Sequence, residues 1–522
     1  MNAKHNPSTS RLVLLLGLVF CAQQAFSQEI HDWEPWRQGR NITGLSAQSS
    51  PRVTIAGKTA ASSAKLLGGY ASGGFHSGSE AEKLWQAGAR AETEVHLPSL
   101  LLTGDFSFIQ QGGDNMCGSM FTQPGFYPVD VLEFTPGRKI LQTYGIGGGL
   151  AWRNDSPWIL GGTFRFEGAN YAKRKDLRHT TYRQDLEVVP SVLFDQSGWR
   201  IGASYIFRKT SEFIQAEQIG AATAESYYAF LDKGLMYGAY QVWDGAGIHL
   251  NEAGVDRFAV KEFTHGFALQ GELGDFLYGD AEWRFTRGTV GEKGYTWFRF
   301  PGMGIDGRLI YTLKRPAGVH SFALNYAWSR QDLDESVIEK VTSGGVMTPT
   351  EYASNRIFER RSLAYGPSWR YYRENGAEFG AAAVITNDRG RSTLMYPFLD
   401  NDESTVADFE ADGVLPLGRF QLSAGVTFGL KIGEHRHYID NDNEDLGVTT
   451  FPFRLEDWWD REQELSDATR LGGSLAVRYN FSMAGIEGLF LEASCAFVHA
   501  FNIVLLPGAN RQETLLSIGY EF

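Results

Sequence analysis

The chain has 522 residues, a formal net charge of −13 at pH 7 and a mean hydropathy of −0.26. The acidic surplus disfavours nucleic acid as a partner, and the hydropathy is too polar for a bundle of membrane helices. Glycine accounts for 60 residues and aromatic side chains for 13% of the chain, a composition that favours a β-rich architecture.

The first 27 residues have the organisation of a secretory signal peptide. Lys4 and Arg11 supply a positive start, and residues 12–22 supply an apolar core too short to span a bilayer. We therefore expect export through the periplasm, cleavage near Ser27/Gln28 and an outer-membrane location. Residues 28–63 show no strand pattern. They are expected to form a periplasmic tail, with a small hatch inside a barrel as the alternative.

Residues 64–522 form a series of segments with one apolar and one polar face. In residues 277–285, apolar residues alternate with Asp280, Glu282 and Arg284, and the same period of two recurs along the chain. A charge facing lipid costs roughly 2–4 kcal/mol at the bilayer midplane, so the charged faces are expected to line a lumen. The predicted lumen-lining residues are Arg90, Glu92, Asp105, Arg200, Asp280, Glu282, Arg284 and Arg478.

The connections between these segments are alternately short and long. Short ones fall near residues 154–157, 196–198, 274–275, 315–317, 374–375, 416–418 and 484–488. Longer polar ones span residues 111–136, 169–181, 210–254, 290–301, 332–355, 388–401, 434–465 and 505–510. Short periplasmic turns and long extracellular loops are typical of outer-membrane barrels. We therefore predict an all-β fold, a transmembrane antiparallel β-barrel of about 18 strands (range roughly 14–18). A soluble solenoid or sandwich is the alternative.

The last strand closes the chain on an aromatic residue. Leu516, Ile518, Tyr520 and Phe522 lie on one face of residues 513–522. This pattern resembles the last strand of bacterial outer-membrane β-barrels. The resemblance implies that these four residues form a signal for the barrel-assembly machinery.

Residues 434–465 contain the strongest candidate for a ligand site. Imidazole and carboxylate groups are metal ligands, so this loop could hold a divalent cation. A calcium loop of the EF-hand type would need glycine where Asp445 stands, and a solvated acidic loop is the alternative interpretation. No other cofactor is expected. The candidate ligands are His435, His437, Asp440 and Asp442.

Two long connections contain apolar residues that need an explanation. Residues 111–136 are apolar for an exposed loop, and they either fold inward and constrict the pore or pack on their neighbours. Trp458 and Trp459 either stack on sugars or pack their loop over the barrel mouth. Enzyme activity is not expected, because no local Ser–His pair stands out and the strand histidines are isolated.

As a whole the chain looks like the large outer-membrane β-barrels of Bacteroidota, which are Gram-negative bacteria. One uncharacterised group there begins with a Trp-rich segment comparable to residues 33–41 (WEPWRQGRN). The resemblance implies location and fold, and it supplies no catalytic residues. Fatty-acid transport barrels also carry an N-terminal hatch, but this chain lacks the Asn-Pro-Ala stretch expected there.

These observations leave two functions open. The first is a porin-like channel or transporter for small solutes. The alternative is a non-conducting accessory barrel that binds a partner, such as a secretion component or a TonB-dependent receptor, through its extracellular loops. In either case the expected surroundings are outer-membrane lipid, lipopolysaccharide and the barrel-assembly machinery.

Overall fold

The computed structural model describes residues 60–97, 99–153, 155–175, 177–217, 227–243, 258–274, 276–292, 295–343, 346–373, 375–393, 400–437, 455–483 and 486–521. The predicted signal peptide and most of the predicted tail, residues 1–59, lie outside the described residues. The first strand begins at Ala60, four residues before the predicted start of the barrel at residue 64.

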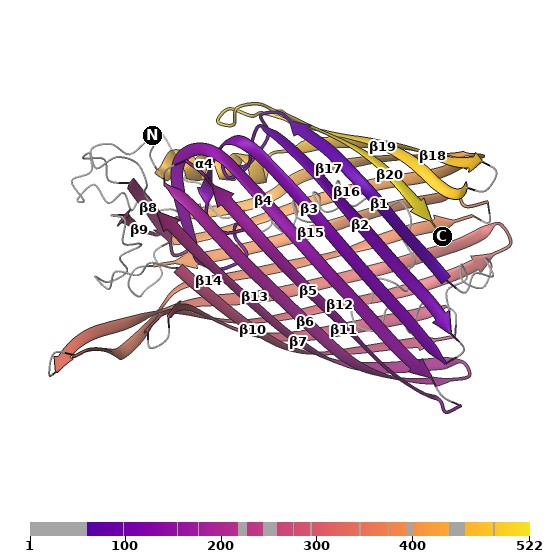
Figure 1. Cartoon of the computed structure of the whole chain (residues 1–522), viewed down its shortest axis with the longest axis horizontal. Coiled ribbons are helices and arrows are strands. Elements are labelled where there is room, and N and C mark those ends of the chain that lie inside the picture. Colours follow the sequence, from indigo (N-terminus) through magenta and orange to yellow (C-terminus); the bar gives the residue numbers. More distant parts are fainter. Residues whose placement is uncertain are drawn as a thin grey trace.

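Eighteen long strands form one sheet that closes on itself (Figure 1). Two short strands, β8 (Tyr227–Asp232) and β9 (Gly238–Trp243), and helix α4 (Leu455–Asp467) do not belong to the ring. The ring strands are, in order, β1 (Ala60–Ser72), β2 (Lys83–Leu97), β3 (Leu100–Ser119), β4 (Asp130–Arg153), β5 (Trp158–Lys173), β6 (Arg178–Gln196), β7 (Trp199–Glu217), β10 (Phe258–Leu273), β11 (Leu277–Glu292), β12 (Tyr295–Arg315), β13 (Gly318–Ser343), β14 (Val346–Tyr372), β15 (Glu378–Ser392), β16 (Asp400–Leu417), β17 (Phe420–His437), β18 (Arg470–Met483), β19 (Ile486–Ala500) and β20 (Asn510–Glu521).

Each ring strand is antiparallel to both of its neighbours. β7 pairs with β10, which bypasses the two short strands between them. β20 pairs with β1 from Ser63↔Glu521 to Ser72↔Gln512, so the sheet has no free edge in the ring. The prediction of a transmembrane antiparallel barrel of about 18 strands is therefore confirmed.

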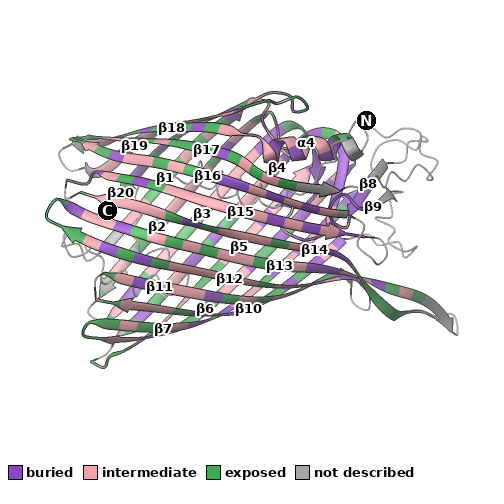
Figure 2. Ribbon diagram, turned by 180° about the vertical axis from the view of Figure 1, so that it is seen from behind, coloured by how far each residue is buried: buried purple, intermediate pink, exposed green. Residues whose placement is uncertain are grey.

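The outer face of the barrel is apolar because apolar and polar residues alternate along the strands. On β10, Phe263 and Phe267 are 39% and 56% exposed, whereas the residues that follow them, Thr264 and Ala268, are buried. Figure 2 shows the same alternation of exposed and less exposed residues along neighbouring strands. We call the exposed, outward-facing apolar side chains of the ring the apolar belt. Contact with lipid is the environment that stabilises such a belt on a closed barrel.

Within the described ranges, no helix combines the length and the apolar character needed to cross a bilayer.

The two ends of the barrel differ as the sequence predicts. At one end, which we call the turn end, short turns join β2 to β3, β6 to β7 and β16 to β17. The first ring strand, β1, begins at this end and the last, β20, finishes there. Gly198 and Gly418 have φ of 91° and 68° in two of these turns, a left-handed conformation that glycine adopts without steric cost. The opposite end, the loop end, carries the longer connections, including those that contain β8, β9 and α4.

Several loop-end strands are longer than predicted. β3 runs to Ser119, and β13 and β14 run to Ser343 and Val346, inside segments expected to be loops. The β13–β14 hairpin projects beyond the rim of the barrel (Figure 1). Beyond the belt a strand no longer needs a lipid-facing apolar side, so its hydrogen-bonded ladder continues through sequence that has lost the alternating pattern.

Candidate functional site: the loop-end cap

Among the described residues, the largest cluster of buried apolar side chains lies at the loop end. It joins residues 120–129 and the start of β4, the β8–β9 hairpin and α4, which together we call the cap, to the loop-end halves of β10 to β14. Burying a large apolar side chain stabilises by roughly 1.5–3 kcal/mol, so this cluster makes the cap a folded part of the protein. Its members include Met120, Phe121, Tyr127, Phe230, Met236, Phe258, Phe298, Phe300, Leu333, Phe358, Trp458 and Trp459.

The connection between β3 and β4 crosses the mouth of the barrel. Arg360 of β14 donates hydrogen bonds to the carbonyl oxygens of Gly125 and Phe126, at 2.9 and 2.8 Å. β3 and β14 are third and twelfth in a ring of eighteen strands, which places them on opposite walls. The Phe126 ring also lies 5.0 and 5.7 Å from the guanidinium carbons of Arg183 and Arg208, on β6 and β7. Of the two interpretations of residues 111–136, the structure favours inward folding.

The same connection is anchored on the wall beside it. The backbone N–H of Thr122 donates to Oε1 of Glu212 on β7 at 2.7 Å, and its hydroxyl donates to the same oxygen at 2.9 Å. Burial raises the pKa of Glu212, a group above the apolar belt, and the bonds from Thr122 partly offset this rise. The hydroxyl of Thr181 on β6 donates to the Met120 carbonyl at 2.6 Å.

The β8–β9 hairpin spans the mouth beside this connection. β8 pairs with the first residues of β4 from Asp130↔Asp232 to Glu133↔Ala229. At the other side of the hairpin, the Ser392 hydroxyl of β15 donates to the Gly234 carbonyl at 3.0 Å. β4 and β15 are far apart in the ring, so the hairpin is a second link across the loop end.

The turn of this hairpin holds two side chains in a strained backbone conformation. Leu235 and Met236 have φ of 56° and 57°, which is uncommon for residues with a large side chain. Both side chains are buried in the cap, so apolar burial offsets the backbone strain. Backbone strain of this kind, of order 1–3 kcal/mol per residue, tends to occur in segments with a functional role.

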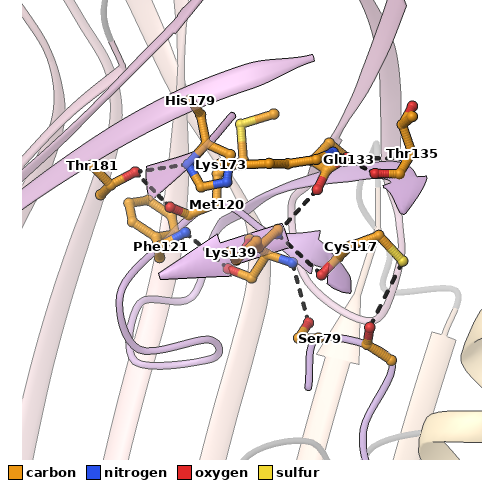
Figure 3. A network of polar contacts seen from close by, with 12 residues as sticks. Ser79, Cys117, Met120, Phe121, Glu133, Thr135, Lys139, Lys173, His179 and Thr181 are labelled. Carbon is orange, nitrogen blue, oxygen red and sulfur yellow. Dashed lines mark hydrogen bonds and ion pairs between the residues drawn. The ribbon is translucent and has the colours of Figure 1, made fainter. Parts of the chain in front are cut away.

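A buried ion-pair cluster fixes the start of β4 (Figure 3). The Glu133 carboxylate lies between Lys139, 3.0 Å from Oε1, and Lys173 of β5, which contacts Oε2. All three side chains are at most 1% exposed. The Lys139 ammonium also donates to the carbonyl oxygens of Cys117 and Ser119, at 3.2 and 3.1 Å, so its donors are directed at β3 as well.

The two lysines of this cluster are affected differently by their surroundings. Both lie beyond the apolar belt. Burial disfavours the charge of Lys139, but Tyr171 and Glu133 outweigh it and raise its pKa. Burial lowers the pKa of Lys173, and Glu133 offsets only part of that effect. One carboxylate therefore serves two buried ammonium groups, and it is the residue on which the cluster depends.

His179 and Cys117 lie beside the cluster and carry no charge at neutral pH. Burial, together with the charges of Lys139 and Lys173, lowers the pKa of His179 well below its ordinary value. Burial raises the pKa of Cys117 to about 11, so its thiol stays protonated. Figure 3 shows both residues at the edge of the network. Neither arrangement resembles an activated base or nucleophile.

Helix α4, which lies in the β17–β18 connection, is hydrogen-bonded to the β19–β20 and β1–β2 connections. Its Glu464 carboxylate accepts hydrogen bonds from the backbone N–H groups of Val504, Leu505 and Leu506, at 2.6, 2.7 and 2.7 Å. Its Glu462 carboxylate accepts from the Gly78 N–H at 2.7 Å, in the β1–β2 connection. Trp459 is fully buried in the cap, which favours the packing interpretation of the tryptophan pair over sugar stacking.

The predicted lumen-lining residues lie on strand faces opposite to the apolar belt, and several are paired. Arg200 contacts Asp195 and Glu272 at 3.2 and 3.5 Å, and Asp280 contacts Arg308 at 2.7 Å. Arg284 contacts Glu282 on its own strand and Asp306 on the next, and Arg478 contacts Glu521. The pairs of Asp280 and Arg284 share β11 and β12, whereas those of Arg200 and Arg478 lie on other strands, so the structure does not gather all the predicted residues into one site. The remaining three, Arg90, Glu92 and Asp105, lie on β2 and β3.

The other predicted residues fall partly outside the described chain. β17 ends at His437, the side chains of His435 and His437 are not described, and Asp440 and Asp442 lie outside the described residues. The divalent-cation site therefore stays a prediction. In the part of the chain that is described, no group of three or more His, Cys, Asp or Glu side chains is placed to hold a metal. Leu516, Ile518 and Tyr520 are exposed in the apolar belt, and Phe522 lies outside the described residues.

The fold and the cap together define a large transmembrane β-barrel with a covered mouth. The chain belongs to a family of unknown function, DUF6850, whose model matches residues 54–522. No curated protein matches the chain at a significant level.

Solved structures with a similar arrangement of strands are outer-membrane barrels of several kinds. Pseudomonas aeruginosa FpvA bound to a heterologous pyoverdine has 9% identity and a TM-score of 0.39, with 89% of this chain and 72% of that chain covered. Acinetobacter baumannii OccAB4 has 10% identity and a TM-score of 0.31, with 89% of this chain and 98% of that chain covered. The RagAB peptide transporter has 8% identity and a TM-score of 0.37, with 84% of this chain and 72% of that chain covered. At these identities the likeness concerns the fold alone, and we transfer no activity from it.

Proposed function

We propose that this protein is an outer-membrane barrel that passes a small polar solute, and that the cap gates the loop end of its lumen. Three features support the proposal: a closed ring of strands, an apolar belt suited to lipid, and strand faces opposite the belt that carry charged side chains. The proposal includes no enzymatic role.

The inner wall of the proposed lumen is polar and its charges are balanced. Arg370 on β14 and Asp412 on β16 make two hydrogen bonds of 3.0 Å, and Arg470 on β18 lies 2.8 Å from Asp408. Side chains of this kind remain favourable in contact with water. Because a carboxylate accompanies each of these guanidinium groups, we expect little preference between cations and anions.

The observation that carries the gating proposal is the contact between the β3–β4 connection and the opposite wall. A connection fixed only at its own base would leave the mouth open. The hydrogen bonds from Arg360 to Gly125 and Phe126 instead hold its tip across the ring. Passage of a solute then requires these bonds and the aromatic contacts of Phe126 to break.

Single-channel conductance in planar bilayers tests this proposal. We expect purified protein to be closed for most of the recording, and a Phe126→Ala/Arg360→Gln variant to show a stable open level. Arg356→Gln is the matched control, because Arg356 is on the same strand but pairs with Asp332 and Asp334 instead of the cap. A double variant as silent as the wild type would refute the gate and the channel.

The second candidate function is a non-conducting barrel that binds a protein partner. The observation in its favour is the β13–β14 hairpin, whose strands of 26 and 27 residues project beyond the rim (Figure 1). Shortening this hairpin would abolish capture of a partner from outer-membrane extracts while leaving conductance unchanged. The gated-channel proposal predicts no such loss.

The proposed location rests on further sequence features. We propose that residues 1–27 are removed near Ser27/Gln28, that Leu516, Ile518, Tyr520 and Phe522 are read by the barrel-assembly machinery, and that the source is a Gram-negative bacterium of the Bacteroidota. Heat-modifiable migration of the mature protein on gels tests the barrel in its membrane form. An unshifted band after mild solubilisation would count against it.

A further inference from the structure

The outer surface has a group of three cations on adjacent strands at the loop-end margin of the apolar belt. Lys209 on β7, Lys261 on β10 and Arg287 on β11 are exposed on three adjacent strands. They share the outward face with Phe263, Phe267 and Phe285 of the belt, which are all exposed. We call these three cations the basic triad.

The strand register places the basic triad around a single aromatic ring. Phe263 is directly opposite Lys209 on one side and Arg287 on the other. Lys261, two residues before Phe263 on the same strand face, is therefore the diagonal neighbour of both cations, about 7–8 Å away in each case. The Lys209 ammonium lies 5.9 Å from the centre of the Phe263 ring. Long flexible side chains at these separations can converge on one anion.

The protein itself does not neutralise these charges. No residue in the described ranges forms an ion pair with Lys209, Lys261 or Arg287, although the chain as a whole is strongly acidic. The residues that face Lys261 across the two neighbouring strands are Ser211 and Thr289, which add hydroxyl groups and no carboxylate.

The next strands of the same margin show what a neutralised position looks like. Arg330 on β13 is paired with Asp332 and Glu359, both at 3.0 Å, and Arg361 on β14 lies 2.7 Å from Glu359. Arg299 on β12 is paired with Glu351. At these positions on β12, β13 and β14 the protein itself neutralises the cations, in contrast to the basic triad.

We infer that the basic triad binds the phosphate of a lipid headgroup in the leaflet at the loop end. The anion satisfies three cations that have no carboxylate, and the attached acyl chains continue onto Phe267 and Phe285 below. A free phosphate would gain the charge contacts but not the apolar ones. The inference rests on the proposed outer-membrane location, with the loop end facing outward, and not on solute passage.

Native mass spectrometry of the full-length mature protein in detergent tests the inference. The probes are bis-phosphorylated lipid A, enzymatically dephosphorylated lipid A and inorganic phosphate. The variant is Lys209→Gln/Lys261→Gln/Arg287→Gln. The matched control, Arg315→Gln/Arg373→Gln/Arg419→Gln, removes three exposed cations from the turn end.

We expect each single change in the triad to weaken binding of phosphorylated lipid A about fivefold, and the triple change about a hundredfold. The control should stay within about twofold of the wild type, and dephosphorylated lipid A should bind as weakly to the wild type as the phosphorylated form binds to the triple variant. Equal binding by wild type and triple variant, or by both lipids, would overturn the inference. Competition by inorganic phosphate at equal concentration would overturn the lipid as its source.

Folding and binding are measured separately. Heat-modifiable migration of the triple variant shows that the barrel is intact. Should the triple variant fail that test, Lys261→Gln alone and the charge-conserving Lys261→Arg replace it. Binding about fivefold weaker in the first, with wild-type binding in the second, supports the inference, and equal binding by both refutes it. A wild-type protein that does not form a heat-modifiable barrel would refute the proposed location instead.

Discussion

Replacing Glu133 by glutamine would leave the ammonium groups of Lys139 and Lys173 buried in the cap without a carboxylate between them. Removing one partner of a buried ion pair costs about 3–5 kcal/mol, because the remaining charge has lost its compensation. Here the full range applies, since all three side chains are at most 1% exposed. At 1.36 kcal/mol per factor of ten, cap opening should become about a hundred to a few thousand times more frequent.

Hydrogen exchange measured by mass spectrometry reports this opening directly. The Met120 amide donates to the Val131 carbonyl at 2.9 Å, across the base of the β3–β4 connection. Its protection against exchange should therefore fall about a hundred to a few thousand times in the variant. Peptides from β18 and β19, which are at least five ring positions from β4, serve as the internal control. Unchanged protection of Met120 in the Glu133→Gln variant would refute the reasoning.

A second variant separates charge burial from packing. In Glu133→Leu/Lys139→Met/Lys173→Met no charge remains to be compensated, and replacing a buried ionic group by apolar residues is often neutral or stabilising. We expect protection of the cap close to that of the wild type. A triple variant that opens as readily as Glu133→Gln would show that the ion pairs act through something other than compensation.

The pH dependence of the Glu133→Gln effect has a defined sign. Burial already lowers the pKa of Lys173 below its ordinary 10.5, and loss of the carboxylate lowers it further. Between that lowered pKa and 10.5, the unfolded state binds more protons than the folded state, so stability rises with pH. The penalty of the variant should therefore be smaller at about pH 9.5 than at pH 7.

Three further outcomes concern the loop end of the barrel. Burial raises the pKa of Asp388, which lies beyond the apolar belt, to about 7 from 3.8, so the folded state retains a proton that the unfolded state releases. In urea titrations in vesicles, the stability advantage of Asp388→Asn over the wild type should therefore grow from about pH 4 to about pH 7 and stay constant above that. A stability difference independent of pH would contradict this. Trp459→Ala removes a fully buried side chain and should cost about 3–5 kcal/mol, seen as faster proteolysis of residues 455–467. Gly234→Ala should weaken docking of the β8–β9 hairpin, because Gly234 has φ of +107° and an added Cβ would lie 2.4 Å from the Phe358 ring; unchanged hydrogen exchange in β8 would argue against it.

The ring could be predicted from the sequence because its signal is local. Alternation in residues such as 277–285 needs only a strand with lipid on one side, and it appears wherever a strand crosses the belt. Strands such as β3 and β13 extend past their predicted ends, because beyond the belt the ladder continues through residues with no such pattern.

The cap could be predicted only in part, because its contacts join distant parts of the chain. The apolar character of residues 120–134 is visible in the sequence and indicates burial. Its partner Arg360 is 235 positions from Gly125, and nothing local in either segment identifies the other. The same holds for Glu133 and the two lysines, whose pairing depends on how β4 and β5 align at the loop end. The strained hairpin turn at Leu235 and Met236 lacks the Asn-Gly pattern from which a tight turn is predicted.

The pairing of β1 with β20 determines how the barrel can be made. Every other pair of ring neighbours is consecutive along the ring strands in sequence, so those pairs can form one after another during synthesis. Until the last strand meets the first, both carry a row of unpaired N–H and C=O groups that cannot remain in a bilayer. An unfinished barrel therefore needs a temporary strand from another protein, or it must insert and close as one event. The seam between residues 63–72 and 512–521 is where that requirement is met.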